Sequence, residues 1–177
     1  MTPHTHNDFD AVALFEAMDA QRIDRGLSWR DVANQIWAVS AVLNERRRDH
    51  PISASTLTGI AKRRDCTCQH ALFILRWLGS APEQFVPGLR RSADDALPSA
   101  GPDRRLRWNL KALYDALNTR RIQQRLSWPE LAADLGCTPH QLTGIRTARF
   151  AIGMALAMRI VRWLDRPASA FVYAAEW

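Results

Sequence analysis

The sequence predicts an all-α protein built from two tandem copies of one small helical unit. Residues 14–33, LFEAMDAQRIDRGLSWRDVA, recur at residues 113–132 as LYDALNTRRIQQRLSWPELA, and the motifs LTGI and RWL follow each copy. A repeat of this length indicates one folding unit used twice. No segment alternates apolar and polar residues between turn signals, so no β-sheet is expected.

The composition is that of a globular protein with an anionic partner. The chain has 177 residues, of which 47% are hydrophobic, and it carries seven tryptophans that suit the thin cores of two small domains. The formal net charge is +6, which favours nucleic acid or a membrane surface as a partner. The alternative is that the charge reflects only an arginine-rich proteome.

The repeat divides the chain into a tail, two domains and a linker. We expect residues 1–7 to be a disordered tail and residues 8–86 to form the first domain. Residues 87–103 are rich in Pro, Gly, Ser and charged side chains, which is typical of a flexible linker. Residues 104–177 then form the second domain, and each domain is expected to hold about five helices.

Capping residues mark the expected helices of the first copy. Apolar residues at helical spacing predict a helix over 8–25, with Asp8 as its cap and Gly26 at its end. Ser28 precedes the second helix, and Asp31 stands three residues later, as in a capping box.

The second copy follows the same order. A helix is expected from about Pro102 to Arg125, and Ser127 caps the next one. A fourth helix is expected over about 153–164, followed by a turn after Pro167 that buries Phe171.

Residues 128–146, WPELAADLGCTPHQLTGIR, contain the features of two helices joined by a tight turn. Ala132 is small enough for a close helix crossing, and Gly136 suits a turn with positive φ. Thr138 caps the next helix, and Leu142 and Ile145 hold that helix against the core. One helix then braces the second, which presents its outer face.

This pattern resembles the Cro/C1-type helix-turn-helix family, the xenobiotic-response-element family of bacterial and phage regulators, over nearly all of residues 106–172. The resemblance implies that the third helix of each copy enters the DNA major groove and touches base edges. Gln pairs with adenine and Arg with guanine, whereas other polar residues hold phosphates. In the second copy the implied contacts are Thr138, His140, Gln141, Thr143, Gly144, Arg146 and Arg149.

The first copy departs from this family pattern at the turn. Residues 37–50 stand where the tight turn should be, and an apolar seam along them predicts that the second helix continues for about three more turns. The contacts implied for this copy are mostly short side chains, which suit phosphates better than bases. They are Ser53, Ser55, Thr56, Thr58, Gly59, Lys62 and Arg63. The first copy is therefore expected to bind weakly, or to serve dimerisation.

Two further features bear on how the repeat contacts DNA. Trp29 and Trp128 take the first position of the second helix, where the resembled family often has Gln, and we expect them to pack. The glycine of LTGI costs about 1 kcal/mol within a helix. Its recurrence is explained equally by close approach to DNA and by shared ancestry. Arg46–Arg48 form either a DNA-binding loop or a solvated helix end.

No metal or catalytic site is expected. The segment CTCQH at 66–70 has too few ligands at unsuitable spacing for zinc. The repeat aligns Cys66 with Ile152 and Cys68 with Met154, which indicates that these thiols lie in the core. The motifs HExxH, GxSxG, GxGxxG and the phosphate loop are missing from the sequence, so we expect neither an enzyme nor a cofactor.

The sequence thus predicts a regulator of transcription that binds double-stranded DNA with two unequal recognition helices. The alternative is a protein-interaction module, such as an antitoxin or adaptor, and the first domain is also a candidate for a homodimer or partner contact. We expect no signal peptide, no membrane span and a cytoplasmic, nucleoid-associated protein, because the longest apolar stretch, residues 151–158, is too short to cross a bilayer.

Overall fold

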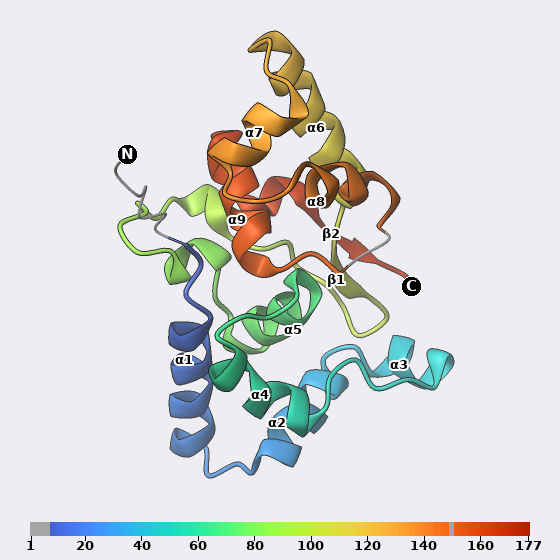
Figure 1. Cartoon of the computed structure of the whole chain (residues 1–177). Coiled ribbons are helices and arrows are strands. Elements are labelled where there is room, and N and C mark those ends of the chain that lie inside the picture. Colours follow the sequence, from blue (N-terminus) through green and yellow to red (C-terminus); the bar gives the residue numbers. More distant parts are fainter. Residues whose placement is uncertain (1–7, 149–150) are drawn as a thin grey trace.

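Nine α-helices and one two-stranded sheet make up residues 8–148 and 151–177, the part of the chain that the computed structural model describes (Figure 1). The expected tail, residues 1–7, lies outside this part. The first half contains α1 (Ala11–Asp24), α2 (Trp29–Ala38), α3 (Ala41–Arg47), α4 (Ala54–Arg63), α5 (Cys68–Leu78) and the 3-10 helix η1 (Pro82–Phe85). The second half contains β1 (Arg105–Trp108), α6 (Leu110–Gln123), α7 (Trp128–Asp134), α8 (Pro139–Gly144), α9 (Met154–Trp163) and β2 (Val172–Ala175), with the 3-10 helices η3 (Ile145–Thr147) and η4 (Ala168–Phe171). The mostly helical class is confirmed.

Three of the four predicted helix caps are confirmed in detail. The side-chain oxygen of the capping residue accepts a hydrogen bond from the backbone N–H three residues later, and the side chain at that later position accepts one from the backbone N–H of the capping residue. This holds for Ser28, Ser127 and Thr138. The first cap was wrong: Asp10, not Asp8, accepts from the N–H groups of Val12 and Ala13. Local capping chemistry therefore fixes where most of these helices begin.

The two copies repeat their internal contacts as well as their sequence. Arg22 donates to the carbonyl of Leu27 at 2.9 Å, and its equivalent Arg121 donates to the carbonyl of Leu126 at 2.7 Å. Each guanidinium also lies over the tryptophan that begins the next helix, at 4.7 Å and 4.4 Å from the ring centroid. The turn from first to second helix is thus built identically in both halves.

An approximate two-fold axis relates the halves where they meet. The N–H of Cys68 donates to the carbonyl of Ile152 and the N–H of Met154 donates to the carbonyl of Cys66, both at 2.8 Å, and Thr67 and Gly153 form an antiparallel bridge between them. These residues are equivalent in the repeat, so the pair of bonds maps onto itself when the halves are exchanged. Such a self-complementary contact is what a two-fold axis produces.

One continuous hydrophobic core serves both halves. Figure 1 places α5 and α9 between the outer helices of the two halves, and buried side chains from both halves belong to one cluster. Trp108 of the second half is buried, and its Nε1 donates to the carbonyl of Cys68 in the first half at 3.2 Å. The chain therefore folds as a pseudo-symmetric pair that shares its centre.

The sheet was not predicted, and it replaces the expected start of a helix. Residues 105–108 form β1 and pair antiparallel with β2, with Arg105 opposite Ala175 and Trp108 opposite Val172. The prediction of a helix from Pro102 was wrong, because α6 begins only at Leu110. The spacing of Leu106 and Leu110 fits a helix, but the strand partner lies more than sixty residues away, where no local pattern reveals it.

The predicted long second helix of the first copy was also wrong. Helix α2 ends at Ala38, and α3 begins at Ala41 after a break at Ser40, whose backbone is not helical. The buried Ser40 hydroxyl donates to the carbonyl of Arg104 at 2.7 Å. This contact with the other half favours the break over a continuous helix.

Residues 87–103, which we expected to be a flexible linker, are anchored at several points. Ser92 caps a 3-10 turn, η2 (Ala93–Asp95), and the carbonyls of Ala100 and Gly101 accept hydrogen bonds from Arg76. The side chain of Asp95 is buried and accepts from the N–H of Ser92 at 2.7 Å. The Arg76 bonds tie the segment to the first half, and the Ser169 hydroxyl, which donates to the carbonyl of Asp94 at 2.6 Å, ties it to the second half.

A buried carboxylate lies where the segment meets the halves. Glu83, only 4% exposed, accepts from the N–H of Ala168 at 2.7 Å through one oxygen, and its other oxygen has no hydrogen-bond partner in the structure. Burial, and then the charge of Asp95, raise the pKa of the Glu83 carboxyl above its ordinary value. The ionised form of this side chain is therefore costly in the folded protein.

Glu83→Gln is expected to stabilise the protein at neutral pH. A carboxyl whose pKa is raised by folding contributes stability below its unfolded pKa and loses it as the pH rises through the folded value. Glutamine keeps an acceptor for Ala168 without the charge, so the variant gains on the order of 1 kcal/mol, or about 2–4 °C in Tm, at pH 8. Thermal unfolding measured from pH 8 down to pH 4 should show the difference in Tm between the variant and the wild type shrinking. A difference that stays constant with pH would contradict the prediction. The exposed substitution Glu16→Gln is the control.

Candidate nucleic-acid interface

Helices α7 and α8 are joined by a four-residue turn that matches the predicted one. Gly136 adopts φ of +62°, and the N–H of Cys137 returns to the carbonyl of Ala132 at 2.9 Å, which closes the end of α7. Leu142 and Ile145 are buried beneath α8 and η3. The outer face of α8 is thereby turned away from the core, as the sequence predicts.

The polar residues of α8 are exposed, but two of them are already engaged with each other. Thr138, His140, Gln141, Thr143 and Arg146 are all exposed, and Gly144 is half-buried. The Gln141 Oε1 accepts from the N–H of Thr138 at 2.9 Å and from its hydroxyl at 3.2 Å. Only the amide N–H groups of Gln141 remain for another partner, so a bidentate contact with adenine requires the capping box to open.

Arg146 is the best-placed cation on this face. It lies at the end of the candidate recognition helix α8, in η3, and no hydrogen bond or ion pair occupies it within the described residues. Thr143, in contrast, donates its hydroxyl to the carbonyl of Pro139 at 3.2 Å. Arg149, also predicted as a phosphate contact, lies outside the described residues.

The polar groups of α4, the equivalent helix of the first half, are largely engaged within the helix. Ser53 caps α4, and its hydroxyl lies 2.9 Å from the hydroxyls of both Ser55 and Thr56. Thr58 donates back to the carbonyl of Ala54 at 3.2 Å. Lys62 is exposed and extends from the last turn of α4.

Gly59 makes room for a side chain of its own helix. Arg63 folds back over α4 and donates to the carbonyl of Thr56 at 3.3 Å. A Cβ on Gly59 would come within 2.4 Å of the Arg63 guanidinium. This clash is with the far end of a flexible side chain that can move aside, so it sets no strict local requirement for glycine at position 59.

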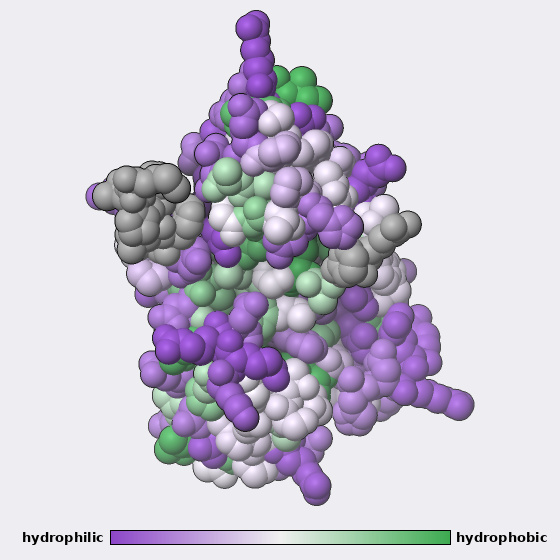
Figure 2. Space-filling model, viewed as in Figure 1, coloured by the Kyte–Doolittle hydropathy of each residue, from purple (hydrophilic) through white to green (hydrophobic). Residues whose placement is uncertain are grey.

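The two candidate recognition helices lie on opposite sides of the approximate two-fold axis. Helix α4 precedes the bridge residue Thr67 in the first half, and α8 and η3 precede the bridge residue Gly153 in the second half. In Figure 1, α2 and α7 lie farther out than α4 and α8. Figure 2 shows the same face, where hydrophilic surface surrounds a paler centre at the junction of the halves.

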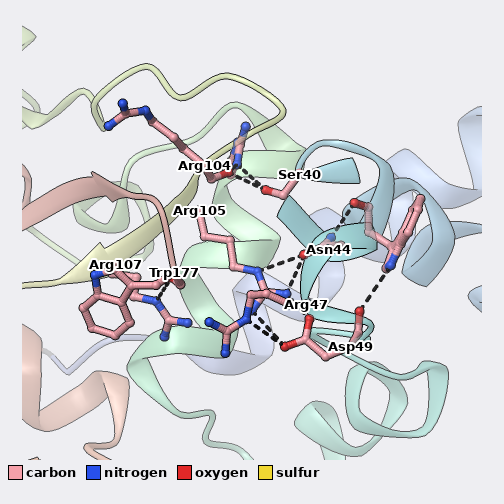
Figure 3. A network of polar contacts seen from close by, with 10 residues as sticks. Ser40, Asn44, Arg47, Asp49, Arg104, Arg105, Arg107 and Trp177 are labelled. Carbon is pink, nitrogen blue, oxygen red and sulfur yellow. Dashed lines mark hydrogen bonds and ion pairs between the residues drawn. The ribbon is translucent and has the colours of Figure 1, made fainter. Parts of the chain in front are cut away.

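The insertion at residues 37–50 contacts the other half of the same chain, which the sequence did not indicate. Arg105 of β1 is buried, and its Nε donates to the Asn44 Oδ1 at 2.9 Å, while its Nη2 bonds to Asp49 (Figure 3). The Arg105 guanidinium holds the pKa of the Asp49 carboxyl below its ordinary value. The sequence signal for this contact was the presence of two polar residues, Ser40 and Asn44, on the buried side of the otherwise apolar seam.

The aromatic and basic residues near the candidate helices have structural roles. Trp29 stacks on Phe15 and Trp128 on Tyr114, with ring centroids 5.3 Å and 5.7 Å apart, so the prediction that both tryptophans pack is confirmed. Arg46–Arg48 are exposed at the end of α3, where Arg47 pairs with Asp49 at 3.2 Å.

None of the described helices is long and apolar enough to cross a bilayer.

The thiols of Cys66 and Cys68 are buried in the core, as the repeat alignment predicts. Burial raises the pKa of each of these two thiols to about 12. Across residues 8–148 and 151–177, no three His, Cys, Asp or Glu side chains come together as a metal site. We therefore assign these cysteines to packing.

The cysteines are expected to react with iodoacetamide in a fixed order. At pH 8 a thiol of pKa about 12 is ionised to roughly one part in ten thousand, so Cys66 and Cys68 should resist alkylation in the folded protein. Cys137 is only half-buried and should be modified first. Mass spectrometry of timed samples tests this order, and alkylation of Cys66 or Cys68 as fast as Cys137 would contradict it. Denatured protein supplies the control in which all three react alike.

Comparisons of the chain with protein-family models, with curated proteins and with solved structures gave no match.

Proposed function

We propose that this chain is a regulator of transcription that binds double-stranded DNA as a built-in pseudo-dimer. The observation that carries the proposal is the pairing of two equivalent helical units across an approximate two-fold axis in a chain of net charge +6. Duplex DNA has the same local two-fold symmetry, and proteins with two recognition helices use it to bind two half-sites at once. A single chain then does what a dimer does elsewhere.

The two-fold relation favours an inverted repeat as the DNA site. Two half-sites in direct repeat are related by translation, which does not match units related by a two-fold axis. The half-site centres should lie about 34 Å, or one helical turn, apart. Because the helices α4 and α8 differ in sequence, the half-sites are expected to differ as well.

The two helices have unequal tasks in this proposal. The 3-10 helix η3, which continues α8, supplies Arg146 for guanine or phosphate, and α8 supplies His140, Gln141 and Thr143 on the exposed face. Helix α4 supplies Lys62 and Arg63 together with hydroxyls that already bond locally, a set that suits phosphates. Sequence discrimination therefore comes mainly from the second half.

The proposal is tested by selecting bound fragments from a random DNA pool and measuring the affinity of the selected site against salt. We expect binding in the nanomolar range whose equilibrium constant falls steeply and linearly with salt on logarithmic axes, because phosphate contacts release counterions. Failure to enrich any fragment, together with a flat salt response, would remove the basis of the proposal.

Gln141→Glu separates DNA contact from folding. Glutamate at this position retains the acceptor that bonds to Thr138, as Glu130 does for Ser127 in α7. The variant should therefore melt like the wild type, yet bind the selected site at least about tenfold more weakly because the new charge faces phosphates. Glu130→Gln, the reverse exchange in the other capping box, is the matched control. Unchanged DNA affinity in Gln141→Glu would exclude α8 from the interface.

A protein-interaction role for the first half is the second candidate. It is favoured by the internal bonding of the α4 hydroxyls and by the exposed apolar side chain of Val42, which lies in the insertion that only this half has. An antitoxin or adaptor of this kind co-purifies with a stoichiometric protein partner and shows no selected DNA site. The selection experiment and the composition of the purified complex distinguish the two functions.

A further inference from the structure

We infer that the insertion and the segment that precedes the second half form a brace that fixes the placement of α4 relative to α8, and thereby the half-site spacing that the protein accepts. The brace consists of residues 37–50, residues 100–105 and Arg76. The spacing part of this inference rests on the proposed function, whereas the fixed placement of the helices does not.

The first limb of the brace is the buried Arg105. This side chain is 4% exposed and reaches from β1 into the insertion, where Asn44, only 1% exposed, and Asp49 receive it. Asn44 is itself held by donating its Nδ2 to the carbonyl of Trp37 at 2.7 Å, and the Trp37 Nε1 donates to the carbonyl of Asp49 at 3.3 Å. Figure 3 shows Asn44 and Asp49 converging on the Arg105 guanidinium.

The second limb is Arg76 of α5, whose guanidinium joins α5 to residues 37–50 and to residues 100–105. It donates to the carbonyl of Val39 at 2.8 Å, to that of Ala100 at 2.7 Å and to that of Arg104 at 3.0 Å. It also donates to the Ser40 hydroxyl at 2.8 Å. In addition, the N–H of Leu43 donates to the carbonyl of Pro102 at 3.2 Å.

These contacts add to the resistance that the shared core and the Glu83–Ala168 bond already offer against one motion, the rotation of the halves about the axis. The Thr67–Gly153 bridge lies at the axis, and a contact at the axis resists separation of the halves better than it resists rotation about it. The brace joins the halves away from the bridge, and the insertion on which it depends has no equivalent in the second copy. Directional hydrogen bonds to buried partners tolerate little displacement, so they oppose this rotation.

The placement of the helices is measured by spin-label distances in the full chain without DNA. Labels are attached at Thr58→Cys on α4 and Thr143→Cys on α8, which are equivalent in the repeat, in a Cys137→Ser background where the remaining thiols are buried. Arg105→Met removes the first limb. Arg104→Met is the matched control, because only the backbone carbonyl of Arg104 takes part in the brace, whereas its partly exposed side chain pairs with Glu176. Asp49→Asn weakens the same limb from its exposed side, for use if Arg105→Met does not fold.

We expect one narrow distance in the wild type and in Arg104→Met, and a distribution at least about twice as wide in Arg105→Met or Asp49→Asn. On DNA sites whose half-sites are moved by one base pair, the wild type should lose about tenfold in affinity per step, and the brace variants less than threefold. Narrow distances in both folded brace variants would overturn the inference. Wider distances in a protein that binds no DNA would uphold the fixed placement and reject the proposed function.

Discussion

Arg146→Glu is expected to reduce the affinity for the selected DNA site on the order of 100-fold. An arginine contact with guanine contributes about 1–3 kcal/mol of discrimination, and the introduced carboxylate adds repulsion from phosphates. Arg146 is exposed and bonds to no other described residue, so the substitution should leave the Tm unchanged. Fluorescence anisotropy of a labelled duplex at two salt concentrations measures both the affinity and the salt slope.

The matched control for this substitution is Arg91→Glu. It makes the same change in net charge at an exposed position in residues 87–103, outside both candidate recognition helices. Its loss of affinity should be severalfold at most and should vanish at higher salt, as expected for a long-range charge effect. Equal losses in the two variants would mean that net charge, and not a contact from the end of α8, determines binding.

Arg76→Met is expected to cause the largest loss of stability of any single substitution considered, about 3 kcal/mol or more. The guanidinium donates to four backbone carbonyls and one hydroxyl, and its removal leaves these acceptors without that partner. Burial lowers the pKa of the Arg76 guanidinium below its ordinary value. Urea unfolding followed by circular dichroism gives the free energy of unfolding.

Arg76→Lys is the informative companion to this variant. Lysine keeps the charge but is a point donor without the planar fork, so it reaches fewer of the carbonyls and should recover only part of the loss. Arg166→Met is the exposed control, because Arg166 lies over the ring of Phe171 and holds no segments together. A loss below about 1 kcal/mol in Arg76→Met would show that the second limb of the brace does not stabilise the fold.

The predictable parts of the structure are those determined by neighbouring residues. The capping boxes at Ser28, Ser127 and Thr138 and the positive φ of Gly136 follow from local chemistry. The burial of Cys66 and Cys68 was predictable because the repeat aligns them with core positions of the other copy. Short-range chemistry and internal repetition therefore determined most helix boundaries.

The missed features depend on contacts between residues far apart in the chain. The pairing of β1 with β2 and the break at Ser40 both involve partners more than sixty residues away. The buried Arg105 is a further case, because one arginine within the run RRLR gives no sign that Asn44 will receive it. A buried polar contact depends on the folded arrangement of two distant segments. It leaves no periodic pattern in the sequence from which it could be predicted.

The same distinction applies to the candidate site. The exposure of His140, Gln141, Thr143 and Arg146 follows from the position of buried Leu142 and the helical period, so the outer face of α8 was predictable. The hydrogen bond between Gln141 and Thr138, which competes with a contact of Gln141 to adenine, could also be foreseen, because the two residues have capping-box spacing. The contact of residues 37–50 with Arg105 of the other half could not be foreseen from the basic and apolar residues of the insertion.

Hydroxyl-radical footprinting of the selected site, combined with the mass of the complex, tests the central claim most directly. One chain per duplex should protect two segments about one helical turn apart, in inverted orientation and with unequal strength, the stronger one weakened by Arg146→Glu. A single protected segment, or two chains on each duplex, would contradict the claim that one chain carries two unequal DNA-reading halves.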